Sequence, residues 1–261
     1  MSFPTVRRVV FLVAAIVSFL PFCLGADETI TIYGPGGPYP AMKNAAEVFE
    51  KLHKVKIEIV QGEGSPPVWA EKAKSDADII YSGSQYMMTN FVESLQGAVD
   101  EATIIPLYLR PSAILVRPGN PKRIHSFSDL LDPRLKILVV DGGGMTGMWE
   151  DMAGKQGDIR NVRYLRRNIA AIARSGSEAK RLWQEKPELD VWLAWNTWQV
   201  ANPQIADLVS VSQDYVIYRP MVIAMTRKGR GSAPAGDFFR FIQSPEGERI
   251  FKKWGWMGSK P

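Results

Sequence analysis

The chain has 261 residues, of which 46% are hydrophobic and 23% charged, as in an ordinary globular protein. One cysteine, Cys23, and two histidines, His53 and His125, are too few for a His/Cys zinc site, and they limit any Ser-His or Cys-His catalytic pair to one of these two histidines. The net charge of +5 suggests a nucleic-acid partner, but the N-terminus argues against one.

Residues 1–26 have the order of an export signal. Arg7 and Arg8 precede an apolar run over 9–24, and the small residues Gly25 and Ala26 follow it. The run is shorter than the roughly 20 residues of a membrane span, and Phe22 before Cys23 disfavours lipidation. We expect cleavage near Ala26 and a soluble periplasmic protein without stable membrane insertion.

The mature chain then has 30 basic and 27 acidic side chains and no cysteine. Its charge of about +3 suits a binder of anions. Neither nucleic acid nor a nucleotide cofactor is expected in the periplasm, so we predict no cofactor. The scarcity of His and Cys predicts no metal site.

The first part of the mature chain predicts an α/β domain. A β-rich run over 29–33, a glycine loop over 34–38, a helical pattern over 41–53 and an alternating strand over 55–60 form a β-α-β unit. A second loop over 62–67 then leads into a helix that continues through Lys74. A strand over 77–81 follows and ends in Ser82, Gly83 and Ser84.

The rest of the chain also alternates predicted strands and helices. Strands are predicted over 137–140 and 191–195, a helix from Thr146 through Ala153, and helices over 162–173 and 177–185. The chain extends again over 215–225. A final helix covers about 235–254 and restarts at Ser244, with Ser as N-cap and Pro at the first helical position.

Two extended segments share an Arg-Pro-x-x-Ile pattern, at 110–114 and 219–223. The pattern is either a coincidence or the mark of two crossovers between lobes. In the second case lobe I comprises residues 27–111 plus 221–261, and lobe II comprises residues 112–220.

Three predicted strands end in loops rich in Gly, Ser or Thr, at 34–38, 82–84 and 142–147. Ligands of open α/β sheets bind outside the carboxyl ends of strands, and backbone N–H groups and helix N-termini there favour an anion. The alternative is that each glycine only shapes a turn. The 142–147 loop lacks the Lys-Ser/Thr ending of a P-loop, and no G-x-S-x-G elbow follows residue 81.

Aromatic and charged residues refine this hypothesis. Trp195 and Asn196 stand at the exit of their strand and are predicted to face the cleft, while Arg110 and Arg219 are candidates to complement a carboxylate, phosphate or sulfate. Which arginine contacts the ligand is left open. The acid pairs Asp76/Asp78 and Glu150/Asp151 are more typical of solvated acids than of catalytic groups.

Six segments together resemble a known family. They are YGPGGP at 33–38, DIIYSGS at 78–84, LYLRP at 107–111 with ILVRPGNP at 114–121, TGMWEDMAG at 146–154, WNTWQVANP at 195–203 and SPEG at 244–247. Through them, residues 28–257 resemble the bacterial extracellular solute-binding proteins that include the molybdate and sulfate binders, and most closely the accessory colonization factor AcfC group.

The resemblance implies a two-lobed periplasmic binding protein fold of type II. Each lobe is a mixed sheet flanked by helices, two extended crossovers join the lobes, and the lobes close on the ligand. The ligand contacts of the oxyanion binders correspond to Gly36, Gly37, Ser65, Thr146, Gly147, Ser177 and Trp195. Glycine replaces a serine in the first loop, and tryptophan replaces a common tyrosine, which points away from simple molybdate.

The sequence thus predicts a monomeric, non-enzymatic receptor for a sulfate-like oxyanion or small organic anion. An ABC permease or a chemoreceptor is the expected partner, and a periplasmic enzyme acting on an anionic metabolite is the alternative. The predicted ligand-binding residues are Gly36, Gly37, Ser65, Ser82, Gly83, Ser84, Thr146, Gly147, Ser177, Trp195, Asn196 and Arg219.

Overall fold

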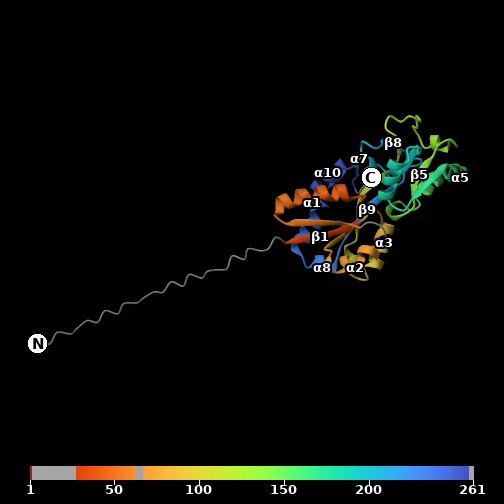
Figure 1. The fold of residues 1–261 in the computed structure, drawn as a ribbon. Coiled ribbons are helices and arrows are strands. Elements are labelled where there is room, and N and C mark those ends of the chain that lie inside the picture. Colours follow the sequence, from red (N-terminus) through yellow and green to blue (C-terminus); the bar gives the residue numbers. More distant parts are fainter. Residues whose placement is uncertain (2–27, 63–66, 259–261) are drawn as a thin grey trace.

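The computed structural model describes Met1, residues 28–62 and residues 67–258. Nine strands in these residues form one curled sheet with the order β2-β1-β3-β9-β4-β7-β5-β6, and β8 pairs with β4 beside this path (Figure 1). The predicted signal segment with Cys23, and Ser65 in the second loop, lie outside the described residues.

The first part of the chain folds as a parallel β-α-β-α-β unit followed by a third helix. Its elements are β1 (Thr29–Gly34), α1 (Tyr39–His53), β2 (Lys56–Gln61), α2 (Pro67–Asp76), β3 (Ile79–Ser82) and α3 (Gln85–Ser94). Helix α1 buries Ala41, Met42, Ala45 and Phe49 at helical spacing against one face of the sheet. Helices α2 and α3 cover the other face (Figure 1).

Two long antiparallel strands form the centre of the sheet. They are β4 (Ile105–Val116), which follows the 3₁₀ turn η1 (Glu101–Thr103), and β9 (Tyr218–Met225). The first half of β4 pairs with β9, and its second half pairs with β7 and β8. The two Arg-Pro segments lie opposite each other, because Arg110 is the register partner of Arg219. The lobe boundaries proposed from the sequence stay a prediction.

The middle of the chain builds a second packed unit. Its elements are η2 (Ser128–Leu131), β5 (Ile137–Val140), η3 (Gly143–Met145), α4 (Met148–Gly154), α5 (Ile159–Asn168), β6 (Ile169–Ala173), α6 (Gly176–Glu185), β7 (Val191–Trp195), α7 (Asn196–Ala201) and β8 (Asp207–Ser210). Its core is separate from that of the first unit and contains Trp183, Trp192 and Trp195, all fully buried.

The chain ends with α8 (Arg227–Arg230), α9 (Ala233–Phe241) and α10 (Pro245–Lys253). The predicted restart at Ser244 is confirmed, because the Ser244 hydroxyl accepts a hydrogen bond from the Gly247 N–H and Pro245 is the first helical residue. Helices α9 and α10 return to the first unit and share its core with α1. The α/β fold class is confirmed.

Two predicted elements are wrong in part. The helix expected over 162–173 ends at Asn168, and Ile169–Ala173 is strand β6, which pairs in parallel with β5. Sheet pairing overrides the helical propensity of this alanine-rich segment. The extension expected from Tyr215 begins only at Tyr218 with β9, because Tyr215 lies in a turn and residues 216–217 are irregular.

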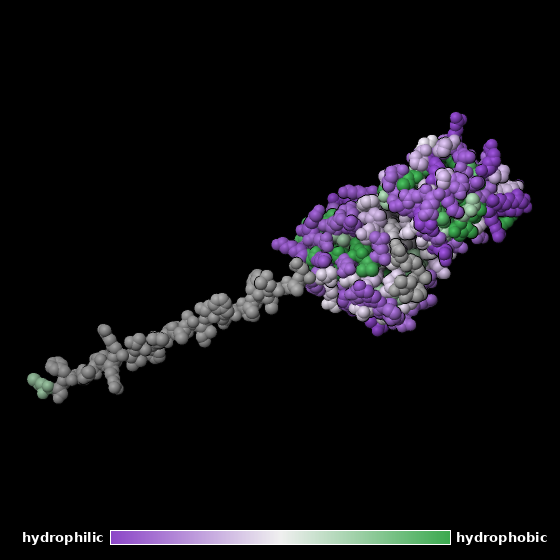
Figure 2. All heavy atoms as spheres, viewed as in Figure 1, coloured by the Kyte–Doolittle hydropathy of each residue, from purple (hydrophilic) through white to green (hydrophobic). Residues whose placement is uncertain are grey.

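In the described part of the chain, no helix combines the length and the apolar character that crossing a bilayer requires. Hydrophilic side chains cover most of the face in Figure 2, with small apolar areas between them.

The Tyr108 side chain links the central strand to the C-terminal helices. Its hydroxyl donates a hydrogen bond of 2.5 Å to the Ile242 carbonyl, and both residues are buried. Tyr108→Phe should therefore lower the free energy of unfolding by about 1 to 2 kcal/mol in urea denaturation. The control is Tyr86→Phe, which removes a hydroxyl from a side chain that is 60% exposed and should change the free energy of unfolding little. Equal decreases in both variants would contradict a stabilising role for the Tyr108 hydrogen bond.

Candidate functional site

Three glycine loops converge on the guanidinium of Arg110. A Cβ atom on Gly37, after β1, would lie 3.2 Å from Arg110 Nη1. A Cβ on Gly83, after β3, would lie 2.9 Å from Nη2, and one on Gly144, after β5, would lie 3.1 Å from Nη2. None of these three glycines has a positive φ, so the site needs them for space rather than for turn conformation.

Arg110 is buried among aromatic rings. The residue is only 2% exposed. Its guanidinium carbon lies 4.9 Å from the Trp195 ring centroid and 4.8 Å from the Trp256 ring centroid. The Trp195 contact follows from the register, because Ser112 on β4 is the partner of Trp195 on β7. Nη2 donates to the Gly83 carbonyl at 2.5 Å, whereas the buried Nε has no partner.

Within residues 28–62 and 67–258, nothing neutralises the charge on Arg110. No carboxylate of the described residues forms an ion pair with it. Burial, and then the nearby Arg219, lower the pKa of Arg110 to about 9. A buried cation without a counter-ion is costly, and an anion placed against Nη1 and Nε would remove that cost.

Arg219 has a different environment from its register partner. Its Nη1 donates to the Thr146 carbonyl at 2.8 Å, and its Nη2 forms an ion pair with Asp151 Oδ2 at 2.7 Å. Its guanidinium lies 5.9 Å from the Trp195 ring. Arg219 therefore holds the loop after β5 in place, and its charge already has a partner.

A cavity of about 350 Å³ opens beside Arg110 between the two units. The first unit contributes Gly36, Gly37, Pro40 and Gln61 to its lining, and the second contributes Ser177, Lys180, Thr197, Trp198, Ala201 and Asn202. Gly37 belongs to this lining and also contacts Arg110 Nη1. Thr197 Oγ1 and Trp198 Nε1 are buried without hydrogen-bond partners, so polar groups that a ligand can use line the cavity.

Several residues predicted from the sequence meet at this site. Gly36, Gly37 and Ser177 line the cavity, and Gly83 and Trp195 contact Arg110. Arg219 lies beside Trp195 and reaches the carbonyl of Thr146. These predicted residues come from loops far apart in the sequence.

Other predicted residues have hydrogen bonds within the protein. Ser82 Oγ donates to the Ser84 carbonyl, and Ser84 Oγ accepts from the Met87 N–H as the N-cap of α3. Asn196 Nδ2 donates to the Gly255 carbonyl at 2.6 Å. The Thr146 hydroxyl makes only a long 3.4 Å bond to the Gly143 carbonyl, and Gly147 has φ +70° at the start of α4. Direct ligand contacts from these residues stay predictions.

Sequence reasoning missed seven cavity residues: Pro40, Gln61, Lys180, Thr197, Trp198, Ala201 and Asn202. Gln61 had a usable signal, because it is the last residue of a strand and precedes a glycine loop. Thr197 and Trp198 directly follow the predicted Trp195 and Asn196. Lys180 lies one helical turn after the predicted Ser177 and so had a usable signal as well. Asn202 carries no local signal, because only the packing of α7 brings it to the cavity.

Residues 30–257 match the family model described as "Bacterial extracellular solute-binding protein". The chain belongs to this family. The resemblance seen in the sequence is confirmed.

Curated relatives of this solute-binding protein include the sulfate-binding proteins of Salmonella typhimurium and Escherichia coli. They are 24% and 23% identical over 206 residues, which are 68% of this chain and 61% of each relative. The matched region thus spans about three fifths of the length of these relatives.

Solved structures of high similarity include Peb3 from Campylobacter jejuni, which is 32% identical to this chain and has a TM-score of 0.80. The match covers 87% of this chain and 99% of that chain. PEB3 with bound L-phospholactate has the same identity and coverages and a TM-score of 0.81. The sulfate-binding protein SubI from Mycobacterium tuberculosis shares the fold, with 17% identity, a TM-score of 0.71 and coverages of 90% and 88%.

The uncompensated charge of Arg110 predicts that this residue lowers stability. Arg110→Met keeps much of the volume and removes the buried cation, so it should raise the free energy of unfolding of the ligand-free protein by about 1 to 3 kcal/mol. Urea denaturation measures this. Arg219→Met removes a paired arginine and should not raise stability. A loss of stability in Arg110→Met would contradict the account.

Proposed function

We propose that this chain is a periplasmic receptor that binds a small organic anion between its two lobes, with Arg110 as the central cation. The observation that carries the proposal is the buried Arg110 guanidinium, which has an unpartnered Nε and no carboxylate among the described residues. The bound anion supplies the missing counter-ion. A hydrogen bond to a charged group contributes about 1.5 to 3 kcal/mol, so a few such bonds suffice for micromolar binding.

The size of the cavity and the relatives support an organic ligand. A cavity of about 350 Å³ falls in the range of roughly 300 to 1,000 Å³ typical of small-molecule sites. The sulfate-binding relatives point to an oxyanion group. The ligand seen in PEB3, L-phospholactate, has both a phosphate and a carboxylate.

Two cations at different places in the site favour a ligand with two anionic groups. Arg110 holds the inner group, together with the N–H groups of the Gly37 and Gly144 loops. Lys180, on α6 and in the cavity lining, holds the outer group, with Gln61 and Thr197 as neutral hydrogen-bonding partners. Thr146, Gly147 and Ser177 keep their predicted roles as ligand contacts in this proposal.

The connections between the lobes support binding by closure. With the lobes predicted from the sequence, residues 27–111 plus 221–261 for lobe I and 112–220 for lobe II, the paired strands β4 and β9 run between the lobes and are the proposed hinge. The lobes meet at the Gly83 and Gly144 loops, where a Cβ on Gly144 would lie 2.8 Å from the Gly83 carbonyl oxygen. Arg110 lies at this meeting point, so an anion bound to it contacts both lobes.

Export fits this function. The proposed signal segment is removed near Ala26, and the mature chain, as a monomer, delivers its ligand to an ABC permease or a chemoreceptor.

An enzymatic role has less support. Asp78 accepts the Thr31 N–H at 2.8 Å and pairs with Lys228 at 3.1 Å, Asp76 accepts the Tyr33 hydroxyl, and Asp151 pairs with Arg219. These acids therefore have structural partners.

Isothermal titration calorimetry with L-phospholactate, lactate, inorganic phosphate, sulfate and molybdate tests the ligand class. The wild type should bind the two-group anion tightest. Arg110→Met should weaken that binding about 100-fold, because a buried charge loses its partner. Lys180→Gln should weaken the two-group anion about 5-fold to 10-fold and leave sulfate unchanged.

The matched control for these variants is Arg227→Met, which removes an exposed arginine of α8 outside the cavity. It should leave every affinity unchanged. Wild-type binding of no anion in the panel, or an affinity that survives Arg110→Met, would contradict the proposed function.

The lowered pKa of Arg110 also predicts a pH dependence. Anion binding requires the charged guanidinium, so affinity is complete well below pH 9 and is lost as the pH rises through the folded-state pKa of about 9. In the Lys180→Gln background, the affinity for L-phospholactate should be constant from pH 7 to 8 and fall about tenfold per unit well above pH 9. A constant affinity up to pH 11 would show that Arg110 is not the titrating contact.

A further inference from the structure

Helix α5 and its flanks hold the excess positive charge of the protein. The chain has 32 basic and 27 acidic side chains, and residues 155–174 contain six of the basic and one of the acidic ones. The remainder of the chain is therefore balanced in charge. A local excess of this kind attracts an anionic partner, which the balanced remainder does not.

Three arginines of α5 are exposed and lack a carboxylate. Arg160 forms an ion pair with Asp158 at 2.8 Å, whereas none of the ion pairs in the described chain involves Arg163, Arg166 or Arg167. Helix α5 lies at the end of the molecule farthest from β1 and α2 (Figure 1), and hydrophilic side chains project from that end in Figure 2. Their charges are thus open to a partner.

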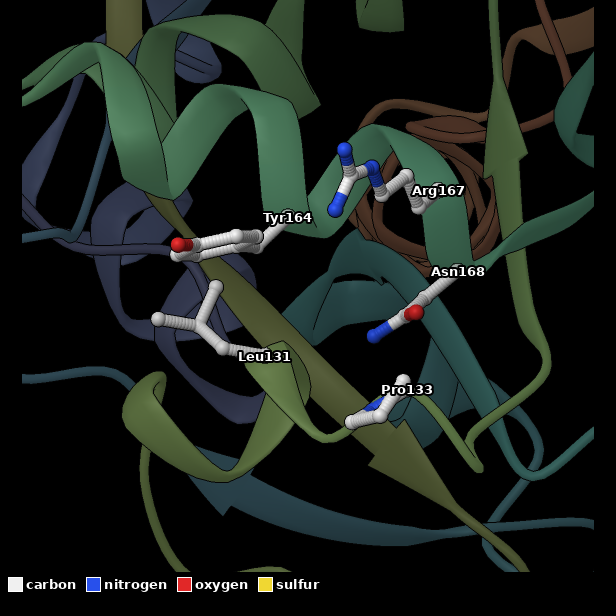
Figure 3. Close-up of a pocket in the computed structure, with 5 residues that line it drawn as sticks. All are labelled: Leu131, Pro133, Tyr164, Arg167 and Asn168. Atoms are coloured by element: carbon white, nitrogen blue, oxygen red, sulfur yellow. The ribbon is translucent and has the colours of Figure 1, made fainter.

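A pocket of about 210 Å³ lies beside these arginines, lined by Leu131, Pro133, Tyr164, Arg167 and Asn168. In Figure 3, Tyr164, Arg167 and Asn168 from α5 stand around an open centre with Leu131 and Pro133 on the opposite side. The Tyr164 ring has the Arg163 guanidinium at 5.4 Å and the Arg167 guanidinium at 5.8 Å. The pocket thus combines an apolar floor with cations at its rim.

Hydrogen bonds from Asn168 fix one wall of this pocket. Asn168 is 5% exposed, and its Nδ2 donates to the carbonyls of Leu130 and Asp132, both at 2.7 Å. These bonds fix the 130–133 segment against the end of α5. The pocket therefore exists before a partner arrives, which reduces the entropy lost on binding.

We propose that this basic surface, formed by Arg163, Tyr164, Arg166 and Arg167 with the adjoining pocket, docks an acidic segment of a protein partner. Guanidinium groups bind carboxylates in a bidentate manner. The pocket has the size of one side chain and so fits an apolar residue within that acidic segment.

A lipid surface fits the same residues less well. A helix that lies in a membrane interface needs a continuous apolar face toward the lipid. In α5, Leu165 is buried and Val162 packs against the core, which leaves Ile159 and Tyr164 as the exposed large apolar residues. The basic surface also supplies no residue to the cavity beside Arg110, so docking there is independent of ligand binding.

Fluorescence anisotropy tests the proposal with a labelled peptide of Glu and Asp that has one central Phe, and vesicles containing phosphatidylglycerol serve as the second probe. The wild type should bind the peptide in low salt, and salt should weaken this binding. Arg163→Gln/Arg166→Gln/Arg167→Gln should weaken it at least 10-fold. Tyr164→Ser, which keeps the charges, should weaken it about 3-fold.

The matched control is Lys51→Gln/Arg227→Gln/Lys253→Gln, which removes the same charge from exposed residues elsewhere and should change peptide affinity less than 2-fold. Anion binding at Arg110 shows that each variant is folded. If the triple variant does not fold, the corresponding Arg→Lys triple replaces it and should weaken peptide binding about 3-fold. Absence of peptide binding, equal losses in both triple variants, or binding to vesicles without binding to peptide would overturn the proposal.

Discussion

The burial of one arginine that has no carboxylate partner in the described part of the chain is the constraint on which the site depends. Arg110 lies among Trp195, Trp256 and three glycine loops, and its charge has no partner among the described carboxylates. Side chains larger than hydrogen at Gly83 or Gly144 would collide with the guanidinium or the facing loop. The buried cation therefore lowers the free energy of unfolding of the ligand-free protein, and a bound anion raises it again.

The sheet topology puts this cation between the lobes. Strand β4 pairs with β9 in its first half and with β7 in its second, and Arg110 lies where the pairing changes. The loops after β1, β3 and β5 reach the same point from both sides. In the proposed function, a ligand on Arg110 contacts both lobes, and this contact couples binding to closure. The basic surface of α5 lies outside this arrangement and serves recognition by a partner.

Local sequence patterns predicted much of this fold, but they did not predict which side chains meet. The strands over 137–140 and 191–195 match β5 and β7, because short apolar runs bounded by turns leave few alternatives. The β6 strand was taken for helix, since its pairing with β5 is not visible locally. Arg110 and Arg219 looked alike in sequence. Only the structure shows that Asp151 neutralises Arg219 and that nothing described neutralises Arg110. Asn202 could not be predicted, because helix packing alone brings it to the cavity.

A crystal structure of the complex with the anion that raises the melting temperature most tests the central claim directly. The account predicts density between the lobes, with an anionic oxygen within hydrogen-bonding distance of Arg110 Nη1 or Nε. A ligand bound without contact to Arg110, or a protein carboxylate found against its guanidinium, would contradict it.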